Sequence, residues 1–178
     1  MKKTIVVAAC AALALPATAG AHATVSPIQP QGTALTSART SYLLRVPNER
    51  ATVGTWKVVL LVPAPVQGAI SFTKVPGWKM TLGEKDTGAK DEAGNAVKSV
   101  TKVTWTAKDR DSELDPHFLG EFGFRFQNPA TATRLCFPVS QYYRKSATAR
   151  VGGEVVRWWG GSSADTPASC IDVKDSAG

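Results

Sequence analysis

Short runs in which apolar residues occupy every second position recur from residue 40 onward, separated by glycine, proline and other turn residues. The clearest run is residues 122–126, where Phe122, Phe124 and Phe126 alternate with smaller or polar residues. Successive side chains of a β-strand point to opposite faces, so this spacing predicts a strand with one face in a hydrophobic core. No stretch after residue 21 has the 3.6-residue periodicity of a helix.

The remaining runs extend this pattern to the whole domain. Residues 56–62 are apolar on both faces, which is typical of a central strand, whereas the polar residues 84–95 favour a hairpin loop. Many short strands with turn signals between them predict an all-β fold, an immunoglobulin-like two-sheet β-sandwich. The expected strands are residues 42–46, 56–62, 69–74, 78–84, 97–107, 122–126, 135–139 and 154–159.

The first 21 residues have the organisation of a signal peptide. Lys2 and Lys3 precede an apolar run at residues 5–15, and residues 19–21 (AGA) form the small-x-small pattern that signal peptidase recognises. Cleavage after Ala21 makes His22 the first residue of the exported protein. Residues 21–23 (AHA) also have the small-x-small form, so cleavage after Ala23, which would remove His22, stays open at this stage.

Removal of residues 1–21 from the 178-residue chain leaves 157 residues, which suits a single domain. We expect that domain at residues 22–160 and a loose tail at 161–178, rich in glycine and serine, that Cys170 pins. Removal of Lys2 and Lys3 lowers the formal net charge from +7 to +5, and the other cations are scattered rather than clustered, so no nucleic-acid partner is expected. No second apolar stretch is long enough to span a bilayer, and we expect a periplasmic protein.

Two cysteines follow the signal, Cys136 and Cys170. An even number of cysteines in an exported chain favours a disulfide between them. The alternative is a copper(I) site of two thiolates. The absence of a CxxC spacing argues against it.

A terminal histidine offers two metal ligands at once. The free α-amino group and the Nδ1 atom of His22 can close one chelate ring on a metal ion, and two nitrogens favour copper(II) among the divalent ions. Such a site needs a further ligand. The candidates in loops or at strand ends are Glu49, Asp115, His117 and Glu121.

Motifs for other chemistry are absent from the sequence. There is no Gly-x-Ser-x-Gly elbow, and the glycine pairs at residues 152–153 and 160–161 lack the lysine and hydroxyl residue of a phosphate-binding loop. We therefore expect no enzymatic activity.

Six short motifs occur in an order and spacing that resemble the YcnI-like copper-binding domain family: 22–27 (HATVSP), 44–49 (LRVPNE), 75–78 (VPGW), 120–122 (GEF), 137–142 (FPVSQY) and 155–158 (VVRW). The resemblance covers nearly all of residues 22–178 and implies cleavage before His22. It further implies a copper(II) site of the single-histidine brace type, with His22 as amine and imidazole ligand, Glu49 as carboxylate ligand and Trp158 packed near the metal. The cysteine pair, His117 and the polar C-terminal tail depart from the family pattern.

The leading hypothesis is an exported copper-binding protein that captures, stores or transfers copper(II), with the copper ion and another periplasmic copper carrier as partners. The alternatives are a copper-dependent oxidoreductase of the oxidative polysaccharide-cleaving type, which would need His117 as a second histidine ligand, and an adhesion or scaffold sandwich without a metal.

Overall fold

The structure is a computed structural model that describes residues 22–28, 32–66, 69–149 and 152–176. All regular secondary structure in these ranges is β-strand. The expected signal peptide, residues 1–21, lies outside the described residues. The strands are β1 (Thr24–Pro27), β2 (Ala34–Leu35), β3 (Arg39–Pro47), β4 (Thr55–Leu61), β5 (Ser71–Phe72), β6 (Trp78–Lys90), β7 (Ala96–Ala107), β8 (Leu119–Gln127), β9 (Thr133–Phe137), β10 (Val139–Tyr143), β11 (Val155–Trp158) and β12 (Ser169–Lys174).

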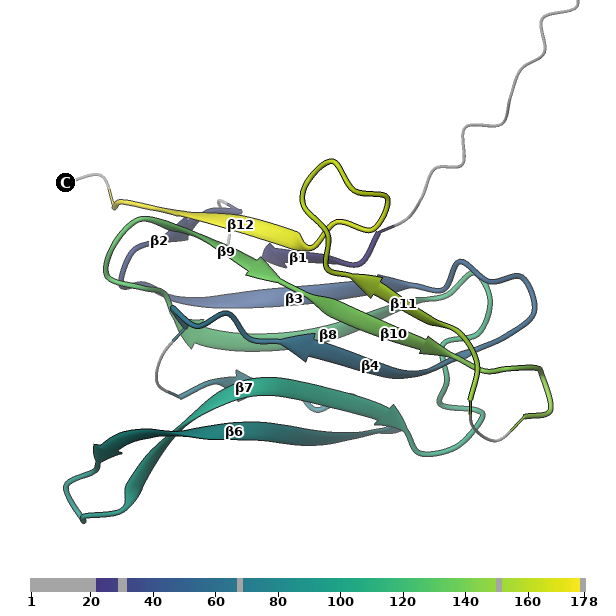
Figure 1. Cartoon of the computed structure of the whole chain (residues 1–178), viewed down its shortest axis with the longest axis horizontal. Helices are drawn as coiled ribbons and strands as arrows, with labels where there is room; N and C mark the ends of the chain where they lie inside the picture. Colours follow the sequence, from purple (N-terminus) through teal and green to yellow (C-terminus); the bar gives the residue numbers. More distant parts are fainter. Residues whose placement is uncertain (1–21, 29–31, 67–68, 150–151, 177–178) are drawn as a thin grey trace, which may run out of the picture.

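Two main sheets form the layers of the sandwich (Figure 1). One has the strand order β1-β3-β8-β5 and the other the order β11-β10-β4-β7-β6. The described strands also form a third, short sheet, β2-β12-β9, which the sequence did not predict. The expectation of an all-β, immunoglobulin-like fold is confirmed.

Alternation along the strands builds the core. Tyr42, Leu44 and Val46 of β3 are all fully buried, as are Val58 and Leu60 of β4. On the long strands the inward face therefore follows the period-two pattern of the sequence. Aromatic rings occupy the centre, where Tyr42 stacks on Phe126 with 4.6 Å between ring centroids. Burial of this apolar surface is the main stabilising contribution to the fold.

Several elements differ from the sequence-based expectations. Residues 84–90 continue β6 rather than forming a loop, and the β6–β7 hairpin reaches beyond the rest of the sandwich (Figure 1). The tail that we expected to be loose contains β12, which pairs with β9 and β2. Cys170 lies directly opposite Cys136 in the β9–β12 ladder and forms a disulfide with it. This bond excludes a copper(I) site of two free thiolates.

Candidate functional site

His22 lies at the boundary between surface and core. Its side chain is exposed, whereas the next residue, Ala23, is 1% exposed and belongs to the core. The imidazole ring packs edge-on against Trp158, with 5.2 Å between ring centroids. Its Nε2 atom lies 3.2 Å from the backbone carbonyl oxygen of Asp165. The ring is therefore contacted by two segments from the C-terminal part of the chain.

Trp158 reaches this position from the other main sheet. It ends β11 opposite Val139 of β10 and is 3% exposed, whereas the next residue, Trp159, is 50% exposed. Adjacent strand residues point to opposite faces, so Trp158 faces inward and Trp159 outward. The indole Nε1 of Trp158 is buried and has no hydrogen-bond partner among the described residues. An unpaired buried donor of this kind requires an explanation, because leaving it unsatisfied costs about 1–3 kcal/mol.

Glu49 lies just beyond the end of β3, where Asn48 fixes the chain. The Asn48 side chain is buried and donates hydrogen bonds from Nδ2 to the carbonyl oxygens of Val53 (2.8 Å) and Leu114 (2.7 Å). Its Oδ1 accepts a hydrogen bond from the backbone N–H of Arg50 (2.8 Å). These bonds anchor the turn on both sides of Glu49, whose own side chain is exposed.

The cation next to Glu49 is already paired. Arg50 donates hydrogen bonds from Nε and Nη2 to the two carboxylate oxygens of Glu154, at 2.8 and 2.7 Å. These hydrogen bonds hold the pKa of Glu154 below its usual value. Arg50 thus makes these side-chain hydrogen bonds to Glu154 rather than to Glu49.

Strand register places His22 and Glu49 at the same end of one sheet. β1 and β3 are antiparallel, with Thr24 opposite Arg45, so continuing the ladder brings His22 level with Pro47. Glu49 follows two positions after Pro47, the last residue of β3. No hydrogen bond joins the two side chains in the described part of the chain. The structure therefore brings His22 into contact with Trp158 and places Glu49 at the same end of the sheet.

The other candidate ligands belong to β8 or to the loop before it. His117 is exposed with a positive φ of 71°, and its loop lies at the Glu49 end of the sheet, because the backbone N–H of Asn48 donates to the carbonyl oxygen of Phe118 (2.9 Å). Glu121 is engaged with Arg45, 3.0 Å between Oε1 and Nε, and Asp115 is an exposed residue of the same loop as His117. Within the residues that the structure describes, no three His, Cys, Asp or Glu side chains form a group that could hold a metal ion.

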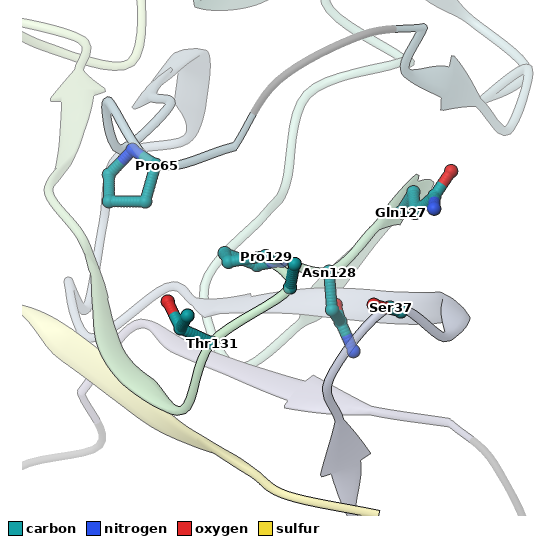
Figure 2. A pocket seen from close by; sticks show the side chains of 7 residues that line it. Ser37, Pro65, Gln127, Asn128, Pro129 and Thr131 are labelled. Carbon is teal, nitrogen blue, oxygen red and sulfur yellow. The ribbon is translucent and has the colours of Figure 1, made fainter.

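A surface hollow of about 580 Å³ lies at the opposite end of the sandwich (Figure 2). It is lined by Ser37, Pro65 and residues 127–131, and Gln127 pairs with Arg39 at the far end of β3 from His22. Asn128 already donates to the Leu35 carbonyl oxygen and accepts from the Tyr42 hydroxyl. This hollow is therefore separate from His22 and Glu49.

Comparison with known proteins identifies the family. Residues 22–173 match the family described as "Domain of unknown function (DUF1775)". The chain belongs to this family. The DUF1775 match begins at His22 and extends past residue 160 to include nearly all of β12.

One curated relative in this comparison is the copper-binding protein CutI of Bacillus subtilis (strain 168), which is 30% identical over 157 residues. The alignment covers 88% of this chain and 64% of the relative, so the chain spans less than two thirds of that protein's length. Together with the DUF1775 match, this relative confirms the resemblance to YcnI-like copper-binding domains.

The fold also recurs in a solved structure. An uncharacterized protein from Nocardia farcinica with an immunoglobulin-like fold superimposes with a TM-score of 0.61 at 21% identity. The match covers 86% of this chain and 98% of the other. At this level of identity, the likeness concerns the fold alone. As for membranes, the described residues include no helix of sufficient length and apolarity to cross a bilayer.

Sequence reasoning missed two groups, one beside Glu49 and one beside His22. Asn48 belongs to a motif that carried the resemblance, but its buried hydrogen bonds were not foreseen. The Asp165 carbonyl is a main-chain group, and any residue type would supply it, so the sequence holds no signal for it.

Proposed function

We propose that this DUF1775 protein is exported, is cleaved after Ala21, and binds copper(II) through a single-histidine brace at His22. The ligands are the new α-amino group, Nδ1 of His22 and the carboxylate of Glu49, and the role is the capture, storage or transfer of copper without catalytic turnover. We place the protein in the periplasm, where another copper carrier would exchange the ion with it. The copper-binding relative supports the choice of metal.

The observation that carries this proposal is the position of His22: exposed, immediately before a buried residue, and packed on Trp158. The described side chains alone do not assemble three ligands. A copper site here therefore needs a main-chain ligand, and a freed α-amino group next to an imidazole supplies one.

Two features favour cleavage before His22 over cleavage after Ala23. Ala23 is 1% exposed and contributes to the core, so a chain that starts at Thr24 would lose a packed residue. The family match also begins at residue 22.

Glu49 and Trp158 have distinct roles in this proposal. The carboxylate of Glu49 offsets part of the metal charge and supplies an oxygen ligand. The indole of Trp158 shields one side of the imidazole from water. The donor set is thus two nitrogens and a carboxylate, which suits copper(II).

The decisive experiment compares the protein that begins at His22 with a variant that carries one additional alanine before it. The extra residue converts the α-amino group of His22 into an amide, so we expect the copper(II) affinity to fall by orders of magnitude in a competition titration. Electron paramagnetic resonance should report two nitrogen ligands for the protein that begins at His22. Equal affinity of the two proteins would contradict the terminal-histidine site.

A His117→Ala variant separates this proposal from the oxidoreductase alternative. Because His117 is not a ligand in the proposed site, its removal should leave the affinity and the resonance spectrum unchanged. A spectrum that loses one nitrogen, together with oxygen-dependent peroxide release in the presence of a reductant, would favour a two-histidine copper enzyme instead.

A further inference from the structure

The loop between β11 and β12, residues 159–168, arches beside the start of β1 (Figure 1). Its contact with His22 is a main-chain contact, 3.2 Å from Nε2 to the carbonyl oxygen of Asp165. A carbonyl oxygen can only accept a hydrogen bond, so the contact requires the ring proton on Nε2. A neutral imidazole carries one ring proton. When that proton is on Nε2, the lone pair of Nδ1 is free to bind a metal ion.

We infer that this loop is a positioning device that holds the imidazole of His22 with Nε2 as donor and Nδ1 free to bind metal. The purpose of the device rests on the proposed copper site. Nδ1 is the nitrogen that can close a ring with the residue's own α-amino group, whereas Nε2 points away from the backbone. Metal-binding histidines commonly donate their second ring nitrogen to a carbonyl or carboxylate, which fixes the ring for ligation.

The loop is built to hold this carbonyl in place. The backbone N–H of Gly160 donates to the Thr166 carbonyl oxygen (2.9 Å), and that of Ala168 donates back to the Gly160 carbonyl oxygen (2.8 Å). A third bond joins Ala164 N–H to the Gly161 carbonyl oxygen (3.0 Å). The loop is thus closed on itself on both sides of Asp165.

Both ends of the loop are fixed to the sandwich. At its start, Trp158 is buried and packs on the His22 ring from a second direction. At its end, Ser169 accepts a hydrogen bond through Oγ from the backbone N–H of Val25 (2.7 Å), and Cys170 is bonded to Cys136. The imidazole therefore lies between an aromatic edge and a carbonyl, each attached to rigid structure.

Two neighbouring glycines provide a matched pair of variants. A Cβ at Gly160 would collide with the Cβ of Ala164 and come within 3.1 Å of the Thr166 carbonyl oxygen, so Gly160→Ala must displace the loop. A Cβ at Gly161 meets no atom within 4 Å, so Gly161→Ala should leave the loop in place. Asp165→Ala removes the side chain but retains the carbonyl, and should also preserve the contact.

The test measures the ring protons of His22 by nuclear magnetic resonance in the copper-free protein that begins at His22. At about pH 8, where an ordinary imidazole is neutral, we expect an Nε2–H signal that exchanges slowly with water. The exposed His117 is the internal reference, since the sequence holds only two histidines. The slow exchange should persist in Gly161→Ala and Asp165→Ala and disappear in Gly160→Ala.

Copper(II) affinity is the second measurement. Loss of an outer partner of a metal-binding histidine typically weakens binding about 10- to 100-fold, and we expect a loss of this size for Gly160→Ala alone. A rapidly exchanging or absent Nε2–H in the unmodified protein would overturn the inference, as would equal copper affinity in Gly160→Ala and Gly161→Ala. The proposed function would be overturned instead if the protein that begins at His22 shows the protected Nε2–H but binds no copper.

Discussion

At the scale of single residues, two neighbours with opposite surroundings define the site. Ala23 is packed in the core, whereas His22 is exposed and its ring contacts Trp158 and the Asp165 carbonyl. On the proposed function, this position leaves the ring accessible to an incoming ion while its neighbours hold it.

The carboxylate of Glu49 can be tested without disturbing the core. Glu49→Gln removes the charge of an exposed side chain, so we expect weaker copper(II) binding, by about 10-fold or more, with an unchanged free energy of unfolding. Isothermal titration calorimetry measures the copper(II) affinity, and urea denaturation measures the free energy of unfolding. Glu121→Gln, on the outer face of the same sheet, is the control and should bind copper normally; equal losses in the two variants would point to a general charge effect.

Asn48 carries the turn that presents Glu49. Asn48→Ala removes two donated hydrogen bonds and one accepted one from a buried position, and it leaves the carbonyl oxygens of Val53 and Leu114 without this donor. We expect a loss of about 2–4 kcal/mol in the free energy of unfolding. Asn95→Ala, in the exposed turn of the β6–β7 hairpin, is the comparison and should cost less than about 1 kcal/mol. Similar costs for both would show that the Asn48 hydrogen bonds contribute little.

At the scale of elements, the sequence located the strands with a clear apolar pattern best, whether alternating or apolar on both faces, as in β4. β7 and β8 were located within a few residues, because their inward residues alternate clearly. The outer part of β6 was taken for a loop, since residues 84–90 have no buried face and are held by pairing with β7. β10 was missed, because the strand expected at residues 135–139 covers most of β9 and stops at Val139, the first residue of β10.

β12 illustrates how composition can conceal a strand. Ile171 and Val173 alternate inward and are largely buried, but glycine, serine and proline before them suggested a loose tail. Of the candidate site, His22 followed from the signal pattern, whereas Glu49 and Trp158 depended on the family resemblance. Neither periodicity nor composition could have selected them among other carboxylates and aromatic residues.

The disulfide that holds β12 should contribute substantially to stability. Cys136 and Cys170 are 34 residues apart, and closing a loop of this length restricts the unfolded chain by about 3–4 kcal/mol. We expect the double variant Cys136→Ala/Cys170→Ala to lose free energy of unfolding of this order in urea denaturation. The unmodified protein with a reductant should lose a similar amount, and the double variant should not respond to the reductant. An unmodified protein that is insensitive to reduction would contradict this assignment.

At the scale of the whole molecule, buried tyrosines make stability sensitive to alkaline pH. Tyr42 and Tyr143 are 0% and 1% exposed, and burial raises the pKa of both hydroxyl groups. As pH rises above about 10, the unfolded chain releases these protons before the folded protein does. The stability contribution is thus complete below that pH and is lost as pH rises towards the folded pKa values.

The free energy of unfolding should therefore decline above about pH 10, and this can be followed by urea denaturation at a series of pH values. Tyr143→Phe should reduce the decline, because it removes one of the two buried hydroxyl groups whose pKa is raised. Tyr142→Phe, which removes a partly exposed hydroxyl, is the matched control. An unaltered pH profile in Tyr143→Phe would exclude that residue as a source.

The cleavage proposed between Ala21 and the exposed His22, directly before the buried Ala23, determines when the copper site forms. On the proposed function, a nascent copy that still carries its leader has every side chain of the sandwich but holds the decisive nitrogen in an amide bond. Such a copy cannot compete for cytosolic copper. Proteolysis at the membrane then acts as a one-way chemical trigger, so that the site first exists in the compartment where the ion is to be met.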